Sequence, residues 1–128
     1  PPRGTKIHFQ FFENEKKCIY VTREEEGVAL AAGLRTANKN PLLLIQQSGM
    51  GNLLNALFTL ADPYGIEFPI MVLIRGEEDE NPIHHYSSMQ TIGLLKLLNG
   101  KKMDLLEMPL AQCLELIKKK HRWIYCPY

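Results

Sequence analysis

Short apolar runs alternate along the chain with longer segments in which apolar residues recur at the spacing of a helix. Strands are predicted for the five short runs: Cys18–Thr22, Pro41–Gln46, Pro69–Ile74, Met103–Glu107 and Trp123–Tyr125. Helices are predicted for the periodic segments: Glu24–Ala37, Gly51–Ala61, Met89–Leu98 and Pro109–Lys119. Strands that alternate with helices build a mainly parallel sheet. We therefore expect residues 1–128 to form a single α/β domain, a three-layer α/β/α sandwich.

Composition and charge fit a folded domain and argue against several kinds of partner. Apolar residues make up 45% of the chain and charged residues 23%, which is ordinary for a soluble globular protein. A net charge of +1 gives no reason to expect nucleic acid, and no apolar run is long enough to span a membrane. The cysteines, Cys18, Cys113 and Cys126, show neither a disulfide framework nor the spacing of zinc ligands. We expect a cytoplasmic protein with no metal ligand on this chain.

Polar turns follow the predicted strands that end at Thr22, Gln46 and Ile74. Ligands of open α/β sheets bind beyond the carboxyl ends of the strands, so these turns are the places where a site is expected. The first turn, Arg23–Gly27, carries three successive glutamates, which also suit the positive end of a helix without any ligand. The second turn, Gln47–Asn52, combines two glycines with a helix start, where unpaired N–H groups face outward.

The third turn is a long acidic loop, Arg75–Pro82, which His84 and His85 follow. Two histidines by themselves are most often surface residues. Nucleotide binding is disfavoured, because the glycine turn lacks both the third glycine of the dinucleotide fingerprint and the GK[ST] ending of a P-loop. Ser48 does not stand in the G-x-S-x-G context of a hydrolase nucleophile. What favours a binding site is the convergence of the three turns at one edge of the sheet.

The segment Cys18–Leu98 resembles a known family. The resemblance is carried by four motifs in this order: TREEEGV with AAG (Thr22–Gly33), QSGMGN (Gln47–Asn52), YGI (Tyr64–Ile66) and RGE (Arg75–Glu77). Together they are similar to the α subunit of sulfopyruvate decarboxylases and to the corresponding part of phosphonopyruvate decarboxylases. This resemblance implies a pyrimidine-binding (PYR) domain of a thiamine diphosphate enzyme that releases carbon dioxide and an aldehyde from sulfopyruvate or phosphonopyruvate.

The resemblance also implies roles for individual residues. Glu24, nine residues before Gly33, is expected to hydrogen-bond the pyrimidine ring and to be catalytic, and a shift of one residue would assign this role to Glu25. His84 is a second catalytic candidate. Arg75, His84 and His85 are expected to bind the substrate. The residues expected to line the cofactor pocket, besides Glu24, are Gln47, Ser48, Gly49, Met50, Gly51 and Asn52.

A partner chain is expected, because the sequence contains no GDG motif of the kind that binds diphosphate through Mg²⁺. A β-type subunit would then hold the diphosphate and the metal, and the active site would be shared in a hetero-oligomer. Relative to the family, the chain is expected to lack the first β-α unit. Two alternatives stay open: a non-catalytic α/β interaction module derived from this fold, and the PYR domain of another thiamine diphosphate enzyme such as a carboligase.

Overall fold

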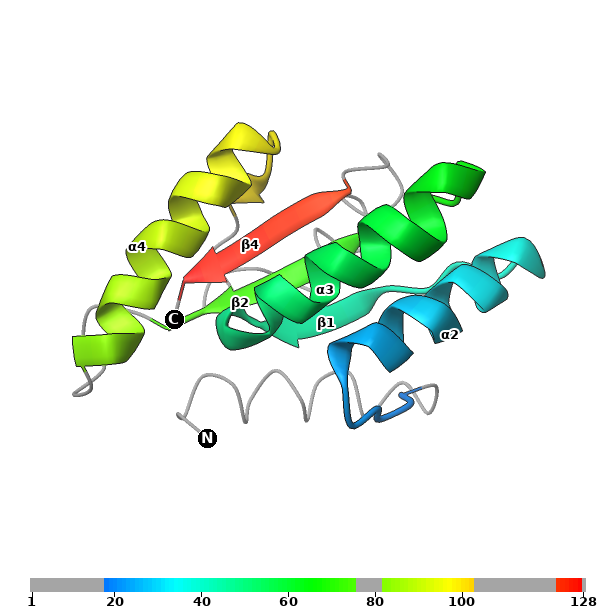
Figure 1. Cartoon of the computed structure of the whole chain (residues 1–128), viewed down its shortest axis with the longest axis horizontal. Coiled ribbons are helices and arrows are strands. Elements are labelled where there is room, and N and C mark those ends of the chain that lie inside the picture. The colour runs from blue at the N-terminus through cyan, green and yellow to red at the C-terminus, as the bar shows by residue number, and fades with distance from the viewer. Residues whose placement is uncertain (1–17, 76–81, 103–121, 128) are drawn as a thin grey trace.

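The computed structural model describes residues 18–75, 82–102 and 122–127, which form a parallel sheet with helices packed against it (Figure 1). The strands of this sheet stand in the order β1-β2-β4-β3, and every neighbouring pair is parallel. Their bounds are β1 Leu43–Gln46, β2 Ile70–Ile74, β3 Lys101–Lys102 and β4 Trp123–Pro127. The expected α/β fold with a parallel sheet is confirmed.

Helices connect β1 to β2 and β2 to β3, in the way that parallel pairing requires. The helices are α2 (Glu24–Thr36), α3 (Met50–Ala56) with its π-helical continuation η2 (Leu57–Ala61), and α4 (Pro82–Leu97). Short 3₁₀ turns, η1 (Gln47–Gly49) and η3 (Asp62–Tyr64), precede and follow the α3–η2 segment. The helices α2 and α3 lie side by side along the sheet (Figure 1). In the parts of the chain that the structure describes, no helix is both long and apolar enough to cross a bilayer.

The core lies between the sheet and these helices. Alternate residues of β2, namely Ile70, Val72 and Ile74, join Val28 of α2 and Leu95 of α4 in one buried cluster. The remaining members are Ala31, Ala32, Leu43, Ile45, Met50, Leu53, Ala56, Leu57, Ala61, Phe68, Trp123 and Tyr125. Each fully buried aliphatic side chain of this kind contributes about 1.5–3 kcal/mol.

The other face of β2 is buried as well. Met71 and Leu73, which point away from the cluster around Val72, are 0% exposed. A strand that is apolar on both faces is typical of a central strand in a parallel sheet covered on both sides. The continuous apolar run Pro69–Ile74 indicated this position from sequence, and the structure confirms a strand there.

Most predicted elements that fall in the described residues are confirmed. The strands near Pro41–Gln46, Pro69–Ile74 and Trp123–Tyr125 are present with shifted ends, as are the helices starting near Glu24 and Gly51. The predicted strand Met103–Glu107 and the predicted helix Pro109–Lys119 lie outside the described residues.

Two predictions were wrong in detail. The run Cys18–Thr22 is not a strand, and Ile19 and Tyr20 are 62% and 63% exposed. Aromatic and β-branched residues favour strands through packing against neighbours, and this segment does not have the burial that such packing gives. The helix predicted from Met89 starts earlier than expected, because α4 begins at Pro82. Proline suits the first helical position, where no N–H is needed.

Candidate functional site

The carboxyl ends of β1 and β2 lie next to each other, since Gln46 of β1 is the partner of Leu73 in β2. The segments that leave these ends are η1, which begins at Gln47, and Arg75. Both therefore start from one edge of the sheet, as the rule for ligand sites in α/β proteins requires. This edge, with the start of α2 and the start of α4, is called the carboxyl edge below.

The start of α2 reaches the carboxyl edge through a close contact between Glu24 and Gly49. A Cβ atom added at Gly49 would lie 2.6 Å from Cδ of Glu24 and 2.5 Å from its Cγ. Real Cβ contacts essentially never fall below about 3.0 Å, so the Glu24 side chain fills the space that a side chain at residue 49 would need. This contact brings the first predicted turn, Arg23–Gly27, against the second, Gln47–Asn52. It is possible because residue 49 is glycine and has no side chain.

The neighbouring carboxylate, Glu25, has a different environment. Its side chain is half-buried, and its Oε2 atom is buried with no hydrogen-bond partner among the described residues. A buried polar atom without a partner is costly, and native structures contain few of them. Glu26, the third acid of the turn, is exposed. Of the three glutamates, Glu25 is therefore the one with a buried carboxylate oxygen that has no hydrogen-bond partner among the described residues.

The second and third turns are joined by a hydrogen-bonded cluster around Gln47, whose side chain is 4% exposed. Its Oε1 atom accepts a hydrogen bond from the backbone N–H of Arg75 at 2.8 Å. Ser88 Oγ of α4 lies 2.8 Å from the same oxygen and 2.8 Å from the carbonyl oxygen of Arg75. The hydroxyl has one hydrogen, so it donates to one of these acceptors at a time. Because the Arg75 N–H is a donor, the Gln47 atom that faces it must be the amide oxygen.

The remaining predicted residues divide between the interior and the surface. In the glycine turn, Gly49 and Met50 are buried, whereas Ser48, Gly51 and Asn52 are exposed. Arg75 is half-buried directly after β2, while His84 and His85 lie in the first turn of α4. The structure thus collects Glu24, Gln47, Gly49 and Arg75 at the carboxyl edge by direct contacts. Among the described residues, it makes no comparable contact for Ser48, Gly51 or Asn52.

Sequence reasoning did not identify Ser88. A signal was present, because Ser88, Thr91 and Leu95 recur at the spacing of one helix face and all three are buried. A hydroxyl residue on a buried helix face needs an internal hydrogen-bond acceptor. That requirement could have marked Ser88 as a link to another element.

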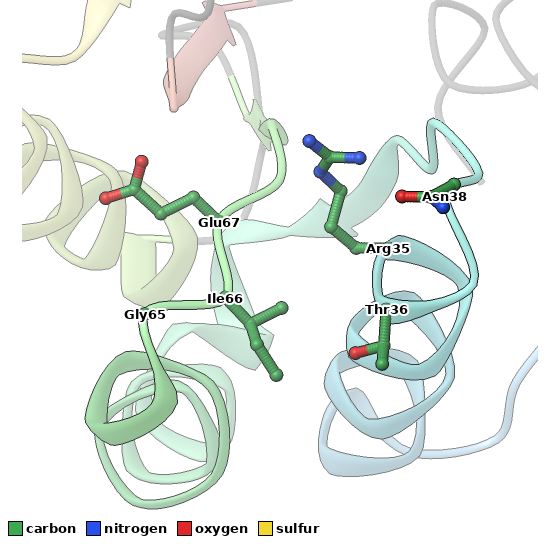
Figure 2. Close-up of a pocket in the computed structure, with 6 residues that line it drawn as sticks. All are labelled: Arg35, Thr36, Asn38, Gly65, Ile66 and Glu67. Atoms are coloured by element: carbon green, nitrogen blue, oxygen red, sulfur yellow. The ribbon is translucent and has the colours of Figure 1, made fainter.

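A surface pocket of about 320 Å³ lies elsewhere, at the end of α2 opposite to Glu24 (Figure 2). The residues that line it are Arg35, Thr36, Asn38, Gly65, Ile66 and Glu67. The Arg35 and Glu67 side chains point in different directions and not toward one another (Figure 2). In the part of the chain that the structure describes, no group of three or more His, Cys, Asp or Glu side chains is placed to hold a metal ion.

The fold places the chain among α/β domains with a parallel sheet, a class in which ligands commonly bind beyond the carboxyl ends of the strands. The chain is 36% identical over 106 residues to the sulfopyruvate decarboxylase of Methanosarcina acetivorans, across 76% of this chain and 27% of that protein. It is 47% identical over 62 residues to the sulfopyruvate decarboxylase subunit alpha of Methanothermobacter thermautotrophicus, across 48% of this chain and 38% of that subunit.

A third relative is the phosphonopyruvate decarboxylase of Streptomyces viridochromogenes, at 32% identity over 94 residues, across 72% of this chain and 22% of that protein. The chain thus spans between about a fifth and a half of the length of the curated relatives it matches. No protein-family model matches the sequence, and no solved structure matches the chain. The resemblance to sulfopyruvate and phosphonopyruvate decarboxylases, drawn above from four short motifs, is confirmed.

Proposed function

We propose that this chain is the pyrimidine-binding part of a thiamine diphosphate-dependent decarboxylase that acts on sulfopyruvate or phosphonopyruvate. The observation that carries the proposal is the pair of half-buried carboxylates, Glu24 and Glu25, at the start of α2 beside the glycine turn. The names of the relatives support a decarboxylase. The designation "subunit alpha" of several relatives supports a chain that works with another subunit.

The residues at the carboxyl edge fit the pyrimidine ring of this cofactor. The ring carries a nitrogen that, when protonated, needs a carboxylate acceptor, and Glu25 Oε2 is a buried acceptor with no partner among the described residues. Charge-assisted hydrogen bonds of this type are about twice as strong as neutral ones. Glu25 is therefore a candidate for this role beside Glu24, which the count from Gly33 selects and whose side chain lies against Gly49.

The chemistry of the cofactor and the work of the chain are separate. When bound, the thiazolium ring supplies the electron sink for the loss of carbon dioxide. The chain holds the pyrimidine through a carboxylate that can share a proton with it. The side chain of Glu24 lies against Gly49 and so borders the glycine turn. The burial of Glu25 Oε2 keeps water from competing for that proton.

Substrate binding is assigned to the end of β2 and the start of α4. Sulfopyruvate and phosphonopyruvate carry a second anion beyond the 2-oxo acid group, which needs charge-assisted donors. The guanidinium of Arg75 is such a donor, and His84 and His85 are candidates from the neighbouring helix start. The diphosphate and its Mg²⁺ are assigned to a β-type partner chain, which the designation "subunit alpha" of several relatives supports.

The test is reconstitution with a β-type chain, thiamine diphosphate and Mg²⁺, with carbon dioxide release measured from sulfopyruvate, phosphonopyruvate and pyruvate. Loss of the carboxylate that holds the ring, in Glu24→Gln or in Glu25→Gln, should lower kcat by about 100-fold or more, since positioned acid–base groups contribute about 10²–10⁴-fold. Glu26→Gln, at the exposed position of the same turn, is the matched control and should keep wild-type activity.

Three outcomes separate the parts of this proposal. A loss with Glu24→Gln and not with Glu25→Gln would assign the role to Glu24. Full activity of both variants would refute the pyrimidine assignment. Tight cofactor binding by the isolated chain, at sub-micromolar Kd, would contradict the shared site, because in a shared site the partner holds the diphosphate.

A further inference from the structure

Three elements that are distant in sequence meet at one buried oxygen atom of the carboxyl edge. Gln47 belongs to η1, Arg75 follows β2, and Ser88 lies in the second turn of α4. The three hydrogen-bond distances among them are all 2.8 Å. Gln47 and Ser88 are each 4% exposed, so water does not compete for these bonds.

The cluster holds the backbone of Arg75 at two groups, its N–H and its carbonyl oxygen. Its N–H donates to Gln47 Oε1, and its carbonyl oxygen faces Ser88 Oγ. A carbonyl oxygen has two lone pairs, so Gln47 Oε1 can accept from Arg75 and from Ser88 together. In that arrangement the side-chain amide of η1 connects the end of β2 to α4. The position of Arg75 relative to the glycine turn then depends on Ser88.

We propose that Ser88 is a positioning residue, which acts through Gln47 and through the backbone of Arg75 and does not contact the substrate. Its hydroxyl holds the start of α4 and the end of β2 at a fixed distance from the glycine turn. Arg75 can then present its guanidinium to the second anion of the substrate at one place. The effect on the substrate rests on the proposed function, whereas the cluster itself does not.

The first measurement needs only the full chain. The variants are Ser88→Ala, which removes the hydroxyl, Ser88→Thr, which keeps it, and Ser87→Ala, a half-buried neighbour that serves as control. In Ser88→Ala the Arg75 amide should exchange its hydrogen about 3- to 10-fold faster, the loss expected for one net hydrogen bond. Ser88→Thr should restore slow exchange, and Ser87→Ala should leave it unchanged. Unchanged exchange in Ser88→Ala would refute the cluster as a restraint.

The second measurement uses the reconstituted complex. Ser88→Ala should raise the KM for sulfopyruvate about 3- to 10-fold and leave kcat within about twofold, because the anion contact weakens and the cofactor contacts stay. Pyruvate, which lacks the second anion, should show no change in KM. A purely structural role would lower the active fraction for both substrates alike, and that result would overturn the proposal. If the wild-type complex is inactive, the proposed function fails. The hydrogen exchange of the Arg75 amide then decides by itself whether Ser88 restrains the Arg75 backbone.

Discussion

Gly49→Ala tests whether the contact between α2 and the glycine turn is as tight as the structure shows. The backbone of Gly49, with φ −89° and ψ 0°, is open to alanine, so the change adds a methyl group without backbone strain. That methyl carbon would lie 2.6 Å from Cδ of Glu24, whereas ordinary contacts begin at about 3.4 Å. Glu24 must therefore move by about 1 Å or change rotamer.

The size of the effect follows from what the Glu24 side chain can do. A forced off-rotamer position costs about 0.5–1.5 kcal/mol, and overpacking in rigid surroundings costs about 1–3 kcal/mol. Glu24 is half-buried and can turn outward, so we expect Gly49→Ala to lower the free energy of unfolding by about 1 kcal/mol. In the reconstituted complex the carboxylate would leave the carboxyl edge.

Gly51→Ala is the matched control from the same turn. A Cβ at Gly51 meets nothing within 4 Å, and the residue is exposed in the first turn of α3. Alanine in place of a helical glycine should stabilise the fold by about 0.5–1 kcal/mol. Both substitutions replace glycine by alanine, and they are expected to change the free energy of unfolding in opposite directions.

Urea unfolding of the purified chain, followed by circular dichroism, measures both effects. A double-mutant cycle with Glu24→Ala isolates the contact, because removal of the side chain leaves the methyl group of Gly49→Ala without an obstacle. The coupling free energy should be about 1 kcal/mol, within the range for residues in contact. Equal stability of the two alanine variants, or an unchanged penalty for Gly49→Ala in the Glu24→Ala background, would refute the reasoning.

Substitutions at three further positions test other parts of the fold by thermal or urea unfolding. Gly27→Ala should destabilise by about 1–3 kcal/mol, because its Cβ would lie 2.8 Å from Cδ1 of Leu43; a stable variant would show that α2 can shift from β1. Gly65→Ala should cost about 1 kcal/mol, since Gly65 has φ +66°, and Gly65→Asn should recover part of the loss. Asp62→Asn should cost about 0.5–1 kcal/mol by breaking the partly exposed ion pair with Arg122. The destabilisation by Asp62→Asn should be smaller in high salt, and an equal destabilisation at all salt concentrations would contradict the ionic explanation.

The sequence was sufficient to predict the buried strands. The run Pro69–Ile74 is apolar on both faces, so it specifies a covered strand without reference to any partner. The run Cys18–Thr22 has similar residue types, but its state depends on what packs against it, and its side chains are exposed. The start of α4 was placed too late, because the periodic apolar pattern is clear only from Met89 while Pro82 already begins the helix.

The candidate site was predicted to the level of turns and not to the level of side chains. A general rule for parallel sheets brings the turns after β1 and β2 to one edge, and the structure has them there. Whether Glu24 or Glu25 projects toward a buried space depends on the rotation of α2, since adjacent helical residues point about 100° apart. The contact of Gln47 with Ser88 joins residues far apart in the chain, which no local pattern specifies.

The place of β4 between β2 and β3 makes the sheet dependent on its last strand. Without Trp123–Pro127, one side of β2 would lose all its backbone partners, from Ile70 to Ile74. An uncovered apolar strand edge recruits strands from other molecules and is a common origin of aggregates. Fragments that end before Trp123 are therefore expected to form inclusion bodies, and any protease cut between β2 and β4 that releases β4 would convert a folded chain into an aggregating one.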